Sequence, residues 1–151
     1  MKKLDHKAIV IGIGNIGRQD DGIAWLFLDY LKEQNINIDL EYRYQLQIED
    51  AELISNYAKV FFIDATKETT EHGFYLKPCL PSITYNFSSH AVEPETILRL
   101  CNKLYNRNPE TSILGIQGYH WDLKIGLSKK GTINFNKAKK YFNDKVLINY
   151  L

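Results

Sequence analysis

The chain has 151 residues, a formal net charge of +1 and 44% hydrophobic residues, which is the composition of one average globular domain. We therefore expect a single domain over residues 1–151, with a core that needs no disulfide or metal for its stability. Because basic and acidic residues nearly balance, the composition gives no support for nucleic-acid binding. No apolar run approaches the roughly 18 residues that span a bilayer, so we expect a soluble, cytoplasmic monomer.

The two cysteines do not indicate a metal site. Cys79 and Cys101 form neither a C-x-x-C pair nor any other metal-binding spacing, and Cys101 ends the apolar helical run 97–101. We therefore expect both to be buried, reduced thiols.

Hydrophobic periodicity predicts strands that alternate with helices. Strands are expected at 8–13, 38–44, 59–63, 73–76, 83–86 and 111–117, and helices at 21–33, 48–57, 92–105 and 134–150. This alternation is typical of βαβ units, which build a mostly parallel sheet with helices on both faces. Ligands of such sheets bind beyond the carboxyl ends of the strands. The site is therefore expected in the loops 12–21, 64–70 and 117–123.

The first of these loops matches a dinucleotide-binding motif. Gly12, Gly14 and Gly17 form G-x-G-x-x-G between a predicted strand and a predicted helix. In such sites the pyrophosphate rests on bare N–H groups at the helix N-terminus. Here Asp20 and Asp21 would place two carboxylates at that position and repel the anion. The end of the second strand also lacks an acidic residue for a ribose hydroxyl, so a dinucleotide-dependent enzyme is the third of our three hypotheses.

Two interpretations remain open for Asp20 and Asp21. An aspartate at a helix N-terminus accepts hydrogen bonds from unpaired N–H groups and complements the helix dipole. One aspartate is sufficient for that purpose. The second is then free to bind a cation at the carboxyl edge of the sheet.

Asp64 and His90 favour the cation. Asp64 follows the buried run 60–63 and so lies at the same edge of the sheet as Asp21, while His90 directly precedes a predicted helix. Taken singly, Asp64 fits a turn or cap and His90 a solvated or structural residue. Two carboxylates and one imidazole converging from three loops would instead form a three-ligand site, open to water or substrate and suited to Ni²⁺, Zn²⁺ or Mn²⁺.

In combination, these residues resemble the hydrogenase maturation proteases, the endopeptidases that trim the C-terminus of the large subunit of nickel–iron hydrogenases. The resemblance runs from about Ile9 to about Phe142. It is carried by Gly12-Ile13-Gly14-Asn15, Asp20-Asp21-Gly22, Asp64, His90, Leu114-Gly115-Ile116 and Gly126-Leu127-Ser128. It implies a three-layer α/β/α sandwich with a twisted, mostly parallel five-stranded sheet.

The resemblance also implies an activity and a site. By position, the nickel-recognition residues of the family fall on Asp21, Asp64 and His90, which become the expected metal-binding and catalytic residues. The implied cofactor is nickel, shared with or supplied by the substrate, and the implied partner is the precursor of a hydrogenase large subunit. No Gly-x-Ser-x-Gly, His-Glu-x-x-His or positioned Cys/His pair occurs, so a covalent or standard zinc-peptidase mechanism has no sequence support.

Three departures from the family pattern keep a second hypothesis open. Gln19 occupies a position where a small residue, usually glycine, precedes the double acid, and Ala24 replaces a glycine. The segment 118–122 also differs from the usual loop. Its His120 is either a fourth polar group near the site or, the interpretation we favour, a surface residue. A non-catalytic relative that binds a metal or a partner is therefore our second hypothesis.

Overall fold

A computed structural model describes residues 4–83 and 92–150 of the chain. The strands are β1 (Leu4–Ile13), β2 (Ile38–Arg43), β3 (Tyr57–Thr66), β4 (Phe74–Pro78) and β5 (Glu110–Gln117). The helices are α1 (Ile23–Lys32), α2 (Asp50–Ile54), α3 (Pro94–Tyr105) and α4 (Lys129–Lys145), with short 3₁₀ turns η1 (Gln19–Gly22) and η2 (Leu147–Asn149). Among these described residues, no helix is both long and apolar enough to cross a membrane.

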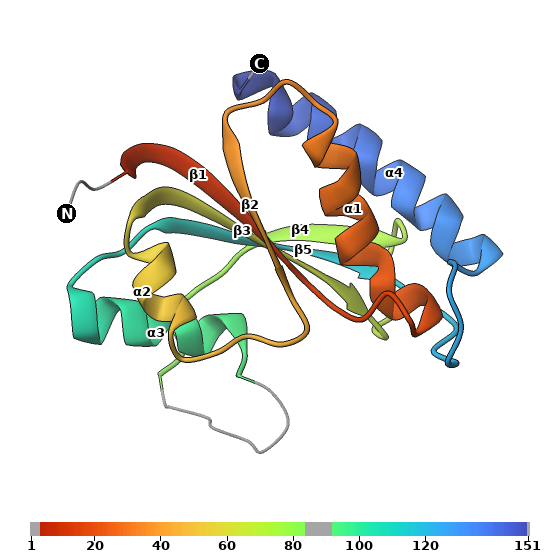
Figure 1. The fold of residues 1–151 in the computed structure, drawn as a ribbon, viewed down its shortest axis with the longest axis horizontal. Helices are drawn as coiled ribbons and strands as arrows, with labels where there is room; N and C mark the ends of the chain where they lie inside the picture. Colours follow the sequence, from red (N-terminus) through yellow and green to blue (C-terminus); the bar gives the residue numbers. More distant parts are fainter. Residues whose placement is uncertain (1–3, 84–91, 151) are drawn as a thin grey trace.

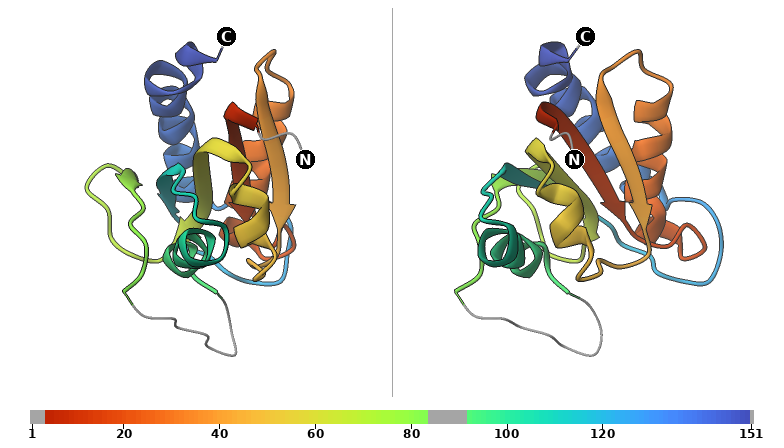
Figure 2. Two further views of the ribbon diagram at one scale, coloured as in Figure 1. Left: turned by 90° about the vertical axis from the view of Figure 1, so that its left-hand side faces the viewer. Right: turned by 60° about the vertical axis from the view of Figure 1, so that its left-hand side comes forward.

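The five strands form one sheet in the order β2-β1-β3-β5-β4. The first four of these strands are parallel, and β4 pairs with β5 in the antiparallel direction. Figure 2 shows the twist of the sheet, with β2 and β4 at its two edges. The predicted mostly parallel five-stranded sheet is therefore confirmed.

Helices cover both faces of the sheet, as predicted. Figure 1 shows α1 and α4 on one side and α2 and α3 on the other. The alternation of side chains along β1 explains the two layers, because Ala8 and Val10 belong to the core under α1 and α4, whereas Ile9 and Ile11 belong to the core under α2 and α3. This arrangement is the expected three-layer α/β/α sandwich.

Several element boundaries differ from the prediction for local reasons. The second helix covers only Asp50–Ile54, because the chain turns at Ser55, whose hydroxyl donates to the Glu52 carbonyl oxygen, and β3 begins at Tyr57. The last helix begins at Lys129, because the Ser128 side chain caps it by accepting from the Gly131 N–H.

The predicted short strand at 83–86 lies almost entirely outside the described residues, and Ile83 itself occupies a bend. Both cysteines are buried and free, as expected. Burial raises the pKa of the Cys79 thiol to about 12 and that of the Cys101 thiol to about 11, which keeps both groups protonated.

We predict that Phe142→Ala lowers the free energy of unfolding by about 3–5 kcal/mol. The Phe142 side chain is fully buried, and its ring centroid lies 5.4 Å from those of both Phe27 and Phe61. The neighbouring Tyr141→Ala is the control, because Tyr141 is 39% exposed. Urea unfolding of the two variants measures the difference. Equal losses would contradict this assignment of the core.

Candidate active site

The loop that follows β1 holds Asp21 at the carboxyl edge of the sheet. The Asn15 N–H donates both to the Asp21 carbonyl oxygen at 3.1 Å and to its carboxylate Oδ2 at 3.0 Å. Gly14 lies so close to the Asp21 carbonyl oxygen that a Cβ at this position would overlap with it, and Gly14 has a φ of +156°. Backbone contacts of the predicted motif thus fix the Asp21 side chain.

Asp20 has different hydrogen-bond partners from Asp21 and has a structural function. Its side chain is completely buried and accepts hydrogen bonds from the N–H groups of Tyr119, His120 and Ser128 and from the Ser128 hydroxyl, at 2.6–3.1 Å. Burial opposes the negative charge, but these hydrogen bonds hold the pKa of Asp20 below its usual value. Asp20 therefore ties the segment 118–128 to the first loop.

Helix capping, one of the two interpretations of this acid pair, is wrong. The N-cap of α1 is Gly22, and no side chain caps that helix. Both carboxylates instead accept hydrogen bonds outside the helix: Asp20 accepts from the segment 118–128, and Asp21 accepts from the Asn15 N–H.

Asp64 lies inside β3, two residues before its end, and not in a turn or cap. In the sheet it pairs with Ile13 of β1 on one side and Gly115 of β5 on the other. Burial and the charges of Asp21 and Glu93 raise the pKa of Asp64 to about 7, although the Ala65 N–H donates to its carboxylate. The parallel register therefore places Asp64, whose charged form is disfavoured, beside the first loop.

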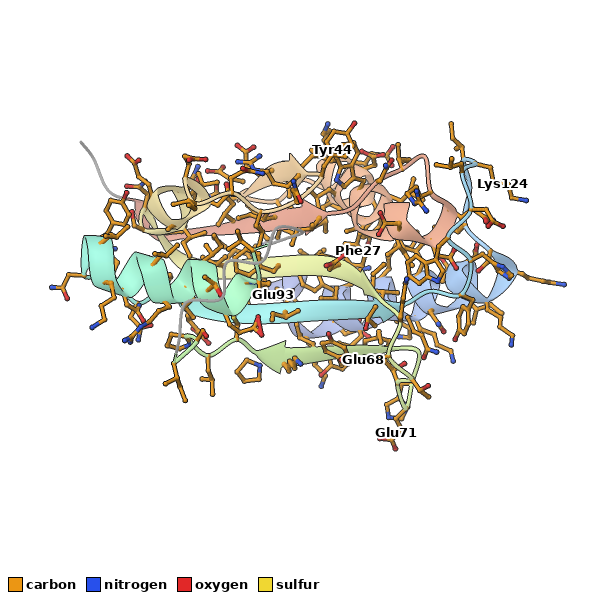
Figure 3. The ribbon with its side chains drawn as sticks, turned by 90° about the horizontal axis from the view of Figure 1, so that it is seen from below. Phe27, Tyr44, Glu68, Glu71, Glu93 and Lys124 are labelled. Atoms are coloured by element: carbon orange, nitrogen blue, oxygen red, sulfur yellow. The ribbon has the colours of Figure 1, made fainter. Side chains whose placement is uncertain are left out.

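Asp21 and Asp64 line the same cavity, of about 260 Å³. Burial raises the pKa of Asp21 as well, opposed by the Asn15 N–H and the charges of Arg18 and Lys67. The remaining lining comes from the β1 end, the segment after β2 and the start of α3, namely Ile13, Gly14, Tyr44, Gln45, Leu46, Val92, Glu93 and Pro94. Figure 3 labels two of these residues, Tyr44 after β2 and Glu93 at the start of α3.

Sequence reasoning did not identify Tyr44 or Glu93 as site residues. Tyr44 follows the second strand at the carboxyl edge of the sheet, so its position along the chain was the available signal. Glu93 follows His90 by three residues and is the N-cap residue of α3. In the sequence, its position indicates only the beginning of a helix.

His90 lies outside the described residues, so the predicted trio of Asp21, Asp64 and His90 stays a prediction. The structure brings together the two aspartates. Within residues 4–83 and 92–150, no three His, Cys, Asp or Glu side chains are arranged to hold a metal ion.

Gln19 and His120 lie in the connection between the first loop and the segment 118–128. Gln19 has a φ of 48°, a left-handed conformation that explains why glycine suits this position. The Gln19 side chain accepts a hydrogen bond from the Asp122 N–H at 3.2 Å, which helps to stabilise this backbone conformation. His120 is exposed and lines a separate hollow with Gln19, away from Asp21 and Asp64, which confirms its interpretation as a surface residue.

The geometry of the first loop disfavours a dinucleotide. The N–H groups of Gly14, Asn15 and Gly17 already donate within the protein, to the Arg43 carbonyl oxygen, to Asp21 and to the Asn15 side chain, respectively. The helix start also carries the Asp21 carboxylate. These N–H groups are therefore already occupied and do not offer donors to a pyrophosphate, which the negative charge of Asp21 would also repel.

Comparisons with known proteins identify the fold. No protein-family model and no curated protein matches the sequence. Among solved structures, the hydrogenase maturating endopeptidase HybD from E. coli matches with a TM-score of 0.71 and 14% identity, over 93% of this chain and 94% of that one. The [NiFe] hydrogenase maturation protease HycI from Thermococcus kodakarensis matches with a TM-score of 0.69 and 18% identity, over 91% and 90% of the two chains. The chain therefore has the fold of these two endopeptidases.

We predict that Asp20→Asn lowers the free energy of unfolding by about 3 kcal/mol, because it leaves several buried donors without a charged acceptor. Amide hydrogen exchange in the segment 119–128 should accelerate in the same variant. Asp122→Asn, which changes an exposed aspartate of this segment, is the matched control and should stay within about 0.5 kcal/mol of wild type. Unchanged stability of Asp20→Asn would contradict the assigned function of this residue.

We predict that the metal-free protein loses stability at Asp64 as the pH rises from about 4 to about 7. The pKa of Asp64 is higher in the folded state than in the unfolded state, so the folded state binds more protons in this window. Asp64→Asn removes this dependence and should be more stable than wild type at pH 8 by about 4 kcal/mol. Urea unfolding at pH 4 and pH 8 tests this, with the exposed Asp144→Asn as control. The prediction fails if wild type and Asp64→Asn differ equally at both pH values.

Proposed function

We propose that this chain is a nickel-dependent endopeptidase that removes a C-terminal peptide from the precursor of a nickel–iron hydrogenase large subunit. The observation that carries the proposal is the pair Asp21 and Asp64, which lines one cavity at the carboxyl edge of the sheet. The pair occurs in a chain with the fold of two hydrogenase maturation endopeptidases, which it covers over at least 90% of their lengths.

The residues of the site fit a divalent cation. Burial raises the pKa values of both carboxyl groups, and repulsion by the charge of Asp21 raises that of Asp64 further. A cation between them would relieve this repulsion, and His90 is the third ligand that the sequence predicts. When bound, nickel would act as a Lewis acid that polarises the scissile carbonyl or activates water. We propose that the nickel arrives as part of the precursor, so that the site recognises a substrate that is ready to be processed.

Neighbouring parts of the chain orient Asp21 and Asp64 and leave both accessible in the cavity. The Asn15 N–H fixes the Asp21 carboxylate, and the sheet register fixes Asp64 beside the end of β1. Because Asp21 and Asp64 remain partly exposed in the cavity, a polypeptide can reach both of them. We further propose that the protein acts as a monomer in the cytoplasm, where folded precursor subunits would be available to it.

We predict that His90→Ala abolishes the processing of a nickel-loaded precursor, with at least a 100-fold loss of rate, because one of three metal ligands is removed. Denaturing gel electrophoresis of purified nickel-loaded precursors measures the cleavage. His72→Ala is the matched control, because the His72 side chain is 72% exposed and outside the cavity. Wild-type cleavage by a folded His90→Ala variant would contradict the proposed site.

The same assay separates the proposal from the non-catalytic alternative. A wild-type protein that binds nickel-loaded precursors but shortens none of them would be a binding module, and the peptidase proposal would be wrong. Cleavage that requires nickel in the precursor supports the proposal.

A further inference from the structure

A row of three residues crosses the sheet at the level of the candidate site. Asp64 of β3 pairs with Gly115 of β5, and Gly115 in turn pairs with Tyr75 of β4. Residues that pair directly across neighbouring strands lie on the same face of a sheet. Asp64, Gly115 and Tyr75 therefore share the face that α3 covers, and the Tyr75 side chain packs against the core on that face.

Gly115 lets the Tyr75 side chain extend across the sheet toward Asp64. A Cβ at Gly115 would overlap with the tip of the Tyr75 ring and would lie 2.6 Å from its hydroxyl oxygen. The hydroxyl therefore occupies the space above Gly115, between β4 and β3. The Lys77 ammonium group, 4.6 Å from the centroid of the Tyr75 ring, covers the ring itself.

A second hollow adjoins the cavity of Asp21 and Asp64. It measures about 240 Å³, and Tyr75 and Thr66 line it together with Asp64. Asp64, Glu93 and Pro94 line both hollows, so Asp64 lies between them. Figure 3 shows the labelled Glu93 at the start of α3 and Glu68 in the segment between β3 and β4, and both residues line the second hollow. A polypeptide that lies across Asp64 would thus extend into a hollow on each side.

The environment of Tyr75 keeps its hydroxyl protonated. Burial raises the pKa of this hydroxyl, as do the charges of Glu68 and Asp64, while a hydrogen bond with the Thr66 side chain opposes the rise. A neutral phenol at neutral pH donates a hydrogen bond. Such a donor is useful in a peptidase where negative charge develops on the carbonyl oxygen.

We propose that the Tyr75 hydroxyl is a further catalytic group, which donates a hydrogen bond to the carbonyl oxygen of the scissile peptide bond. In hydrolysis, the oxygen of a water molecule bonds to the carbonyl carbon, and the carbonyl oxygen takes up the electron pair of the C=O double bond. The carbon–nitrogen bond then breaks as the C=O bond re-forms, and a proton from the water goes to the leaving nitrogen. Tyr75 keeps its own proton and stabilises the intermediate oxyanion.

This inference rests on the proposed peptidase activity, and the decisive variant is Tyr75→Phe, with nickel-loaded hydrogenase large-subunit precursors as the probe. We expect kcat to fall about 100-fold, while KM changes less than about twofold, because the interaction forms only as charge develops. Tyr141→Phe is the matched control and keeps wild-type kcat, because Tyr141 contacts Phe74 from α4, on the opposite face of the sheet. Urea unfolding verifies that both variants are folded.

The outcomes distinguish this inference from the proposed function. If the wild-type protein cleaves a precursor and folded Tyr75→Phe cleaves it equally fast, Tyr75 is not catalytic but the peptidase proposal stands. A higher KM with an unchanged kcat would also overturn the inference, because it would indicate a binding contact alone. If wild type cleaves no precursor, both proposals fall. Should Tyr75→Phe not fold, Thr66→Val replaces it: a lower kcat at constant KM supports the inference, and an unchanged kcat contradicts it.

Discussion

The buried carboxylate of Asp20 is the contact on which the arrangement of the site loops depends. It joins the loop after β1 to the segment 118–128 through four hydrogen bonds, and it lies at the start of α4, where the helix dipole favours a negative charge. Asp20 is buried, whereas the next residue, Asp21, lines the cavity. Two adjacent aspartates thus serve different purposes: one fixes the loops and the other remains available at the site.

The second constraint is the parallel register of β1 and β3. It places Asp64 directly opposite Ile13, the last residue of β1, so that the carboxylates of Asp64 and Asp21 line one cavity. Burial and this proximity both disfavour the charged form of Asp64 in the metal-free protein, as its raised pKa reflects. Groups with strongly perturbed pKa values in a cleft are typical of functional sites, and a bound cation would convert the repulsion into attraction.

Much of the fold could be predicted because hydrophobic periodicity reports directly on burial. The alternation in β1 and the apolar faces of α1 and α3 lead to the observed layers. The limits of α2 and α4 could not be predicted in the same way, because the Ser55 and Ser128 side chains set them through local hydrogen bonds. At the site, position along the chain was sufficient to predict that Asp21 and Asp64 converge.

Other parts of the site depend on tertiary contacts that leave no local pattern. The capping interpretation of Asp20 was wrong because its partners lie about 100 residues away in the chain. Tyr75 was not noticed for a similar reason, since only the pairing of β4 with β5 brings it over Gly115. The need for glycine at position 115 likewise cannot be predicted from the sequence, because it depends on the Tyr75 ring that packs on Gly115.

The most direct test of this account is a crystal structure of the protein soaked with nickel or cadmium, examined for anomalous density at the cavity. We predict one ion bound by the carboxylates of Asp21 and Asp64 and by the His90 imidazole, at distances of about 2.0–2.4 Å. Asp64→Asn crystals, soaked in the same way, should show weaker density or none. A cavity without an ion in wild-type crystals, with the His90 side chain directed away from the two aspartates, would contradict the account.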